Sequence, residues 1–345
     1  MAGTATKPAR DRGVDPATAE RLRTWLRQML LIRHFEEKAG EAYSLGKIGG
    51  FCHLYIGQEA LAVGTLSALR ADDYVVSAYR EHGQALARGM SPRAVMAELY
   101  GKATGCSRGK GGSMHLFDAS LNFLGGHGIV GGQIPLGTGF AFAAKYRGTD
   151  QVSLCYFGEA AVNIGAFHES LNIAGLWKLP VIYVIENNGY GMGTAVSRSS
   201  AITDLYERAA SYNMPGVVVD GQDVEKVKAA TDAAVDRARR ESAPTLMEIR
   251  TYRYVGHSMS DAAHGTYRTK EEVEEYRQRD PITVLERRMR EAGLLDDAAM
   301  KALDAEVLAE VEDAVKFAEE SPDPAPDELW TDVYAPERAD AGENA

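Results

Sequence analysis

The segments Val152-Ser-Leu-Cys-Tyr-Phe-Gly-Glu-Ala160 and Val181-Ile-Tyr-Val-Ile-Glu-Asn-Asn188 decide the fold of this 345-residue chain. Each contains an apolar run with the length of a buried strand, and each ends in polar residues. The 26 residues between Ala160 and Asn187 can hold one helix and the second strand. The unit is therefore predicted to be strand, turn, helix, strand, which brings both strand ends together at one edge of a parallel sheet.

Three groups suited to an ion site meet at this edge: the Glu159 carboxylate, the Asn188 amide and the N-terminus of the predicted helix. A divalent cation favours oxygen ligands, and a diphosphate favours free backbone N–H groups. The alternative is an ordinary α/β turn followed by an Asn188-Gly189 turn with no ligand. The spacing alone leaves both interpretations open.

Apolar runs and amphipathic segments alternate along much of the chain, a pattern typical of an α/β fold whose mostly parallel sheet has helices on both faces. Strands are predicted over 74–78, 152–157, 181–185, 217–220 and 245–252, and helices over 17–45, 58–69, 82–88, 92–100, 134–145, 161–177, 224–240, 281–292 and 297–319. We expect one domain over 17–320 with helical N-terminal and C-terminal extensions. A flexible start at 1–16 and an acidic, proline-rich tail at 321–345 flank it.

The composition excludes several functional classes. A net charge of −11 and an isoelectric point near 5.3 argue against nucleic acid or an anionic membrane as the main partner. No run of eighteen apolar residues is present, and residues 1–13 lack the apolar core of a secretion signal. Cys52, Cys106 and Cys155 are too far apart for a zinc motif or a disulfide framework, so we expect a cytoplasmic protein.

Glycine is concentrated between residues 101 and 139, which contain twelve glycines in thirty-nine residues. Such density suggests a backbone that approaches a ligand closely, with a flexible linker as the alternative. Gly109-Lys110-Gly111 lacks the spacing of a phosphate-binding Walker motif, so its N–H groups are predicted only to line an anion site. Gly126-His-Gly-Ile-Val-Gly131 matches the dinucleotide-binding GxGxxG pattern, but weakly, because residues 114–124 do not look like a buried strand.

Three further residues are candidates from their positions. Arg80 follows the strand at 74–78, where a guanidinium can bind phosphate with two hydrogen bonds. His257 lies in the polar loop 255–261 after a strand, where functional residues concentrate. His53 sits in an apolar stretch, and taken alone it is typical of a core histidine.

Four motifs taken together resemble a known family. They are an altered Gly-Asp-Gly…Asn-Asn thiamine diphosphate signature at 158–188, Phe51-Cys-His-Leu-Tyr-Ile-Gly-Gln-Glu-Ala60, Gly109-Lys-Gly-Gly-Ser-Met-His115 and Tyr252-Arg-Tyr-Val-Gly-His-Ser-Met-Ser-Asp261. The chain resembles, over about residues 17 to 330, the α subunits of the decarboxylating component of 2-oxo acid dehydrogenase complexes. Within that family it is most similar to the pyruvate dehydrogenases. The sequence departs from the signature at Glu159 and Ala160, where the family usually has Asp and Gly.

The resemblance implies a thiamine diphosphate-binding fold with Mg²⁺ at the sheet edge. The metal ligands would be Glu159, the Asn188 side chain and the Tyr190 carbonyl. The cofactor-binding residues would be Tyr79, Arg80, Gly128, Val130, Glu159, Ala160, Ala161, Asn188, Tyr190 and His257. His53, near the substrate, and His257 would be the catalytic residues.

The resemblance also implies an enzyme that works in an assembly. Pyruvate would be decarboxylated, and the acetyl group would pass to a lipoyl group of a dihydrolipoamide acyltransferase. A β subunit would complete an α2β2 heterotetramer and supply the glutamate that activates the cofactor. The alternatives are an acetoin or branched-chain 2-oxo acid dehydrogenase α subunit, or a non-catalytic paralogue suggested by the departures at Glu159 and Ala160.

Overall fold

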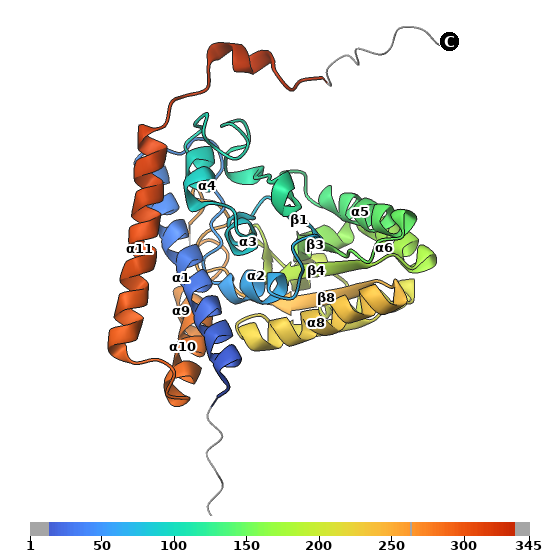
Figure 1. The fold of residues 1–345 in the computed structure, drawn as a ribbon. Coiled ribbons are helices and arrows are strands. Elements are labelled where there is room, and N and C mark those ends of the chain that lie inside the picture. The colour runs from blue at the N-terminus through green and yellow to red at the C-terminus, as the bar shows by residue number, and fades with distance from the viewer. Residues whose placement is uncertain (1–13, 263, 335–345) are drawn as a thin grey trace, which may run out of the picture.

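A six-stranded parallel sheet forms the centre of the protein in a computed structural model that describes residues 14–262 and 264–334. The strand order is β2-β1-β3-β4-β8-β7 (Figure 1). The strands are β1 (Tyr74–Ala78), β2 (Phe123–His127), β3 (Ser153–Gly158), β4 (Val181–Asn187), β7 (Gly216–Asp220) and β8 (Thr245–Arg250). The predicted α/β fold is confirmed. The predicted flexible start and the end of the tail fall largely outside the described residues.

The two central strands carry alternating side chains into two separate cores. On β3, Leu154 and Tyr156 face one core, whereas Cys155 and Phe157 face the other, because successive side chains of a strand point to opposite faces. Ser153 to Gly158 pair in register with Val181 to Glu186. This pairing places the ends of β3 and β4 side by side, as the sequence predicts.

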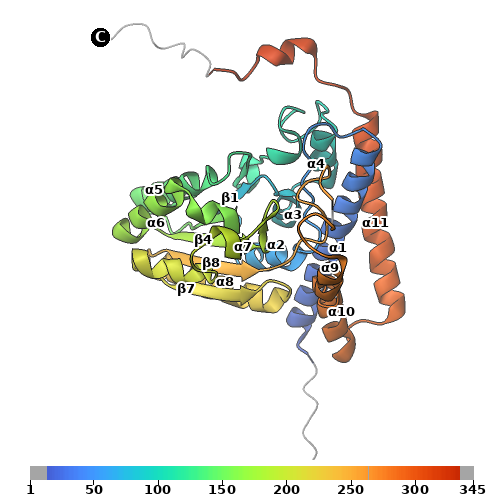
Figure 2. The same ribbon diagram turned by 180° about the vertical axis from the view of Figure 1, so that it is seen from behind.

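Helices cover both faces of the sheet (Figures 1 and 2). On one face lie α5 (Gln133–Arg147) and α6 (Gly165–Trp177), and on the other lie α2 (Glu59–Leu66) and α8 (Val224–Glu241). The remaining short helices are α3 (His82–Arg88), α4 (Pro92–Leu99), α7 (Val196–Ser199), α9 (Lys270–Arg277) and α10 (Pro281–Glu291). Among the described residues, no helix has the length and apolar character needed to cross a bilayer.

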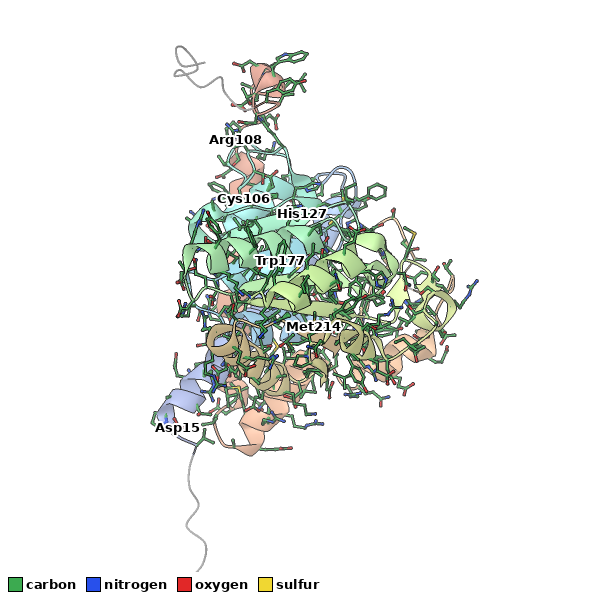
Figure 3. All side chains as sticks on the ribbon, turned by 90° about the vertical axis from the view of Figure 1, so that its right-hand side faces the viewer. Asp15, Cys106, Arg108, His127, Trp177 and Met214 are labelled. Carbon is green, nitrogen blue, oxygen red and sulfur yellow. The ribbon has the colours of Figure 1, made fainter. Side chains whose placement is uncertain are left out.

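Two long helices form an outer layer beside the sheet. The helix α1 (Pro16–Ser44) begins at Asp15, whose side chain accepts a hydrogen bond from Thr18 N at 3.0 Å, and Figure 3 shows this residue at one extremity of the fold. The helix α11 (Asp297–Glu320) packs along α1 and α4. Arg27 joins α1 to α11 through two carboxylates of the latter helix. The N-terminal and C-terminal helical segments therefore support one another.

The structure differs from the sequence predictions in three places. A strand, β2, occupies 123–127, where none was predicted; it is a short edge strand that pairs only with β1 and needs no long apolar run. The residues after Gly158 form a 3₁₀ turn over Glu159–Asn163, so α6 begins at Gly165 and not at 161. A two-stranded hairpin of β5 (Tyr190–Gly191) and β6 (Thr194–Ala195) follows β4.

Candidate functional site

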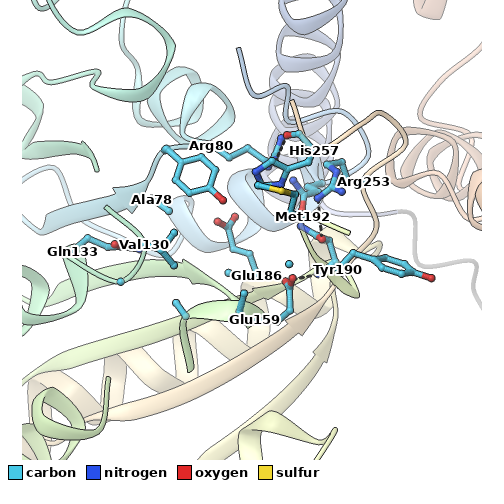
Figure 4. Close-up of a pocket in the computed structure, with 18 residues that line it drawn as sticks. Ala78, Arg80, Val130, Gln133, Glu159, Glu186, Tyr190, Met192, Arg253 and His257 are labelled. Atoms are coloured by element: carbon cyan, nitrogen blue, oxygen red, sulfur yellow. Dashed lines mark hydrogen bonds between the residues drawn. The ribbon is translucent and has the colours of Figure 1, made fainter. Parts of the chain in front are cut away.

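A pocket opens at the carboxyl ends of β1, β3 and β4, the edge where the sequence places the ion site (Figure 4). Its lining includes Gln58, Tyr79, Arg80, Val130, Gln133, Glu159, Ala160, Ala161, Glu186, Asn188, Tyr190, Met192, Arg253 and His257. Nine of the ten predicted cofactor-binding residues are in this set. The tenth, Gly128, lies in a neighbouring hollow with His115 and His127.

The oxygen donors of the predicted metal site meet in this pocket. Glu159 is buried, and its Oε2 accepts a hydrogen bond from Asn188 N at 3.3 Å. Burial raises the pKa of Glu159, because the charged carboxylate is poorly solvated. The Asn188 Oδ1 atom accepts a 3.3 Å hydrogen bond from Arg253 Nη1, while its Nδ2 donates to Gln58 Oε1 at 3.2 Å. The second contact fixes the amide so that its oxygen turns away from Gln58.

Two buried guanidinium groups give the pocket its positive charge. Arg80 donates to the backbone oxygens of Leu54 at 2.8 Å and His257 at 2.6 Å, and Arg253 donates to Val255 O, Asn188 Oδ1 and the Tyr267 hydroxyl. Within the described ranges, neither of them forms a salt bridge with a carboxylate. Burial and then the neighbouring Arg253 lower the pKa of Arg80 to about 10. Arg80 therefore remains charged at neutral pH, and two guanidinium groups in one pocket suit it to an anion.

Tyr79 and His257 line the pocket, and His53, which is not a lining residue, contacts the rings of both. The His53 ring lies 4.6 Å from the Tyr79 ring and 5.2 Å from the His257 ring, measured between centroids. Burial, followed by the charge of Arg80, lowers the pKa of His53 to about 2 and that of His257 to about 4. Both imidazoles are therefore neutral at pH 7. Both have a buried Nδ1 atom without a partner in the described part of the chain, which leaves that atom available to a ligand.

Glu186 is a pocket residue that the sequence analysis did not select. Its Oε1 accepts hydrogen bonds from the Tyr55 hydroxyl at 2.5 Å and from Gln84 Nε2 at 2.7 Å. Burial raises its pKa to about 7. A charged residue that ends an apolar strand directly before Asn187-Asn188 is the signal that could have identified it.

Three other pocket residues were also missed: Gln58, Gln133 and Arg253. Arg253 follows β8 and lies in an otherwise apolar string, yet its contact with Asn188 joins positions 65 residues apart. Gln58 Nε2 and Gln133 Oε1 are buried and have no partner among the described residues. Such unpaired polar atoms at a pocket are further binding groups that only the folded structure reveals.

The backbone N–H groups of the glycine-rich loop bind a side chain of the protein itself. The N–H groups of Ser107 and Gly109 donate to Glu98 Oε2 at 2.8 and 2.9 Å, and those of Gly111 and Gly112 donate to Oε1 at 2.7 and 3.0 Å. The anion in this loop is thus the buried carboxylate of Glu98 from α4. The prediction that Gly109 and Gly111 line a ligand's anion site is wrong, because the chain supplies its own anion there.

The GxGxxG segment at 126–131 was expected to lack a preceding strand, and this expectation is wrong. The strand β2 ends at His127, and α5 begins at Gln133. However, β2 is an edge strand, and Gly128 faces a hollow outside the pocket of Glu159 and Asn188. Gly131 lines that pocket and Gly128 does not, so the glycines of this motif do not together line one crevice, as a dinucleotide site requires.

Comparisons with known proteins show the family to which the chain belongs. The family model for the dehydrogenase E1 component matches residues 27–327. The chain is 55% identical over 308 residues to the pyruvate dehydrogenase E1 component subunit alpha of Rhizobium meliloti, covering 89% of this chain and 88% of the relative. It is 50% identical over 319 residues to the protein of that name from Zymomonas mobilis, covering 92% and 89%. The somatic, mitochondrial form from Bos taurus is 47% identical over 311 residues, covering 90% and 78%.

Proposed function

Because the chain belongs to the dehydrogenase E1 component family, we propose that it is the α subunit of a thiamine diphosphate-dependent pyruvate dehydrogenase. The prediction of an enzyme of this family, an oxidoreductase, is confirmed by the family match and by relatives from three organisms. In the proposed reaction pyruvate is decarboxylated, and its acetyl group passes to a lipoyl group of a dihydrolipoamide acyltransferase.

The pocket fits the diphosphate and the metal of this cofactor. The observation that carries the proposal is that Arg80 and Arg253, both buried and without a carboxylate partner among the described residues, share one pocket with Glu159 and Asn188. Carboxylate, amide and carbonyl oxygens are ligands that Mg²⁺ accepts together with phosphate oxygens, so Glu159, Asn188 and the Tyr190 carbonyl would hold the ion. Arg80 and Arg253 would then balance the charge of the diphosphate.

The chemistry of the cofactor and that of the chain are distinct. When bound, thiamine diphosphate supplies the nucleophilic carbon and the electron sink for loss of CO₂. His53 and His257 are neutral at pH 7, so each can donate a hydrogen bond from one ring nitrogen and accept a proton at the other. Their place beside Tyr79, at the side of the pocket, suits them to the substrate carbonyl or carboxylate.

A β subunit is the proposed partner, in an α2β2 assembly in the cytoplasm. The outer surface of α5 and α6 supports a subunit contact, because six large apolar side chains remain exposed on these helices: Leu136, Phe142, Tyr146, Ile173, Leu176 and Trp177. Figure 3 shows Trp177 on this side of the fold. Large apolar groups gathered on adjacent helices are a common feature of surfaces that become covered on assembly. The family resemblance places the glutamate that activates the cofactor on the β subunit, so we expect no activity from the α subunit alone.

The test is to purify the chain with its β subunit and to follow cofactor binding and decarboxylation separately. Calorimetric titration should show thiamine diphosphate binding that requires Mg²⁺, and turnover should be fastest with pyruvate among pyruvate, 2-oxoisovalerate and acetoin. No preference for pyruvate would favour the branched-chain or acetoin reading. Metal-dependent binding without decarboxylation of any substrate would favour a non-catalytic paralogue, and no metal-dependent binding would overturn the cofactor assignment.

A further inference from the structure

The side chain of Tyr190 leaves the pocket, although its backbone lies at the pocket. Figure 4 shows its ring pointing away from Glu159. The hydroxyl ends on α9, where it donates to both carboxylate oxygens of Glu272, at 3.0 and 3.1 Å. The residue proposed to give a backbone oxygen to the metal is therefore anchored through its other end to a helix 82 positions along the chain.

Glu272 is placed for this contact and not for capping its own helix. Thr269 is the N-cap of α9 and accepts a hydrogen bond from Glu272 N at 3.1 Å, so Glu272 occupies the third position of a capping box. In that motif the glutamate side chain reaches back to the N-cap backbone. Here its Oε1 instead accepts from the Tyr252 hydroxyl at 2.8 Å as well as from Tyr190.

Tyr252 connects Glu272 to the segment that contacts Asn188, a second proposed metal ligand. The Tyr252 ring stacks on Tyr276 of α9 with centroids 3.9 Å apart and planes 5° from parallel. The next residue in the chain, Arg253, donates to Asn188 Oδ1. Glu272 thus contacts Tyr190 directly and holds the segment whose arginine contacts Asn188.

We propose that Glu272 is a positioning residue of the metal site, which fixes the Tyr190 carbonyl by holding the Tyr190 hydroxyl. The proposal rests on the proposed function, because it takes the Tyr190 carbonyl as a metal ligand. Mg²⁺ requires near-ideal octahedral geometry, whereas Ca²⁺ accepts variable coordination and longer bonds. A loosened carbonyl should therefore weaken Mg²⁺ binding more than Ca²⁺ binding, an asymmetry that general destabilisation would not produce.

The test is calorimetric titration of Mg²⁺ and of Ca²⁺ into the assembly of this chain with its β subunit, at saturating thiamine diphosphate. Tyr190→Phe keeps the carbonyl and removes only the hydroxyl. It should weaken Mg²⁺ binding about tenfold, the lower end of the effect of supporting residues in metal sites. Glu272→Ala should have the same effect, and both should change Ca²⁺ affinity by less than about twofold. The double variant should lose no more than either single one, because the two changes remove one interaction.

Two further variants act as controls. Glu272→Gln keeps an oxygen that can accept from both tyrosines and should restore Mg²⁺ affinity. Glu275→Ala changes an exposed glutamate of the same helix and should have no effect. Unchanged Mg²⁺ affinity in Tyr190→Phe, or equal losses for both ions, would overturn the role of Glu272 while leaving the cofactor assignment intact. If the unmodified assembly binds the cofactor without any divalent ion, both proposals fail.

Discussion

The buried carboxylate of Glu98 offers the sharpest test of how the glycine-rich loop is held. Glu98 is fully buried and accepts four backbone hydrogen bonds from Ser107, Gly109, Gly111 and Gly112, two on each oxygen. Glu98→Gln keeps the shape of the side chain and replaces one oxygen by an NH₂ group. Because this group is itself a donor, two of the four backbone N–H groups lose their acceptor.

The magnitude follows from the number of bonds lost. A hydrogen bond to a charged group contributes about 1.5–3 kcal/mol to stability. Loss of two such bonds should therefore lower the free energy of unfolding by about 3–6 kcal/mol. A single surface substitution usually changes it by less than about 0.5 kcal/mol.

The assay is urea denaturation of Glu98→Gln beside the unmodified chain and Glu169→Gln, a control on an exposed glutamate of α6. The expected result is a transition midpoint shifted to clearly lower urea in Glu98→Gln and unchanged in the control. The loop also carries Ser113, whose hydroxyl accepts a hydrogen bond from His53 N at 3.2 Å, so loss of loop order should reach the pocket. A loss in Glu98→Gln of less than about 1 kcal/mol would refute the reasoning.

Three other predictions concern single residues. Burial raises the pKa of Glu81 to about 8 from about 4.5, so between these values the folded protein keeps a proton that the unfolded chain releases, and stability falls as pH rises. Glu186 contributes a slope of the same sign, so Glu81→Gln should make the fall in stability shallower without abolishing it, as urea denaturation at several pH values would reveal. The pKa of His257 is lowered to about 4, so His257→Gln should reduce the rate without removing any step in the pH–rate profile between about pH 6 and 8. Glu159→Asp should preserve or improve Mg²⁺ affinity in calorimetry; a large loss would mean that the site is built around the longer side chain.

The sequence predicted the parts of the fold that depend on long, regular patterns. β3 and β4 are continuous apolar runs, and their parallel pairing followed from the single helix that fits between them. β2 was missed because an edge strand of five residues with two glycines has neither apolar length nor alternation. The predicted helix begins at 161 and not at Gly165, because the 3₁₀ turn that contains residues 161–163 has a local pattern similar to that of an α-helix.

The same limit applies to the site. Glu159, Asn188 and Arg80 could be found because each directly follows a strand, and strand ends meet at one sheet edge. Arg253 and Glu98 act through contacts that no local pattern encodes, since their partners are placed by the packing of other segments. The roles of His53 and of the Tyr190 carbonyl came from family resemblance alone.

The altered signature at Glu159 and Ala160 is matched by a feature elsewhere in the chain. A Cβ placed on Gly191 would lie 2.5 Å from the Ala160 methyl group, closer than two carbons can approach. Gly191 therefore has to be glycine while residue 160 is alanine, and the hairpin that carries Tyr190 packs directly on that methyl. Glu159 Oε1 would lie 3.8 Å from the same Cβ, so both departures from the family pattern face Gly191 of this hairpin.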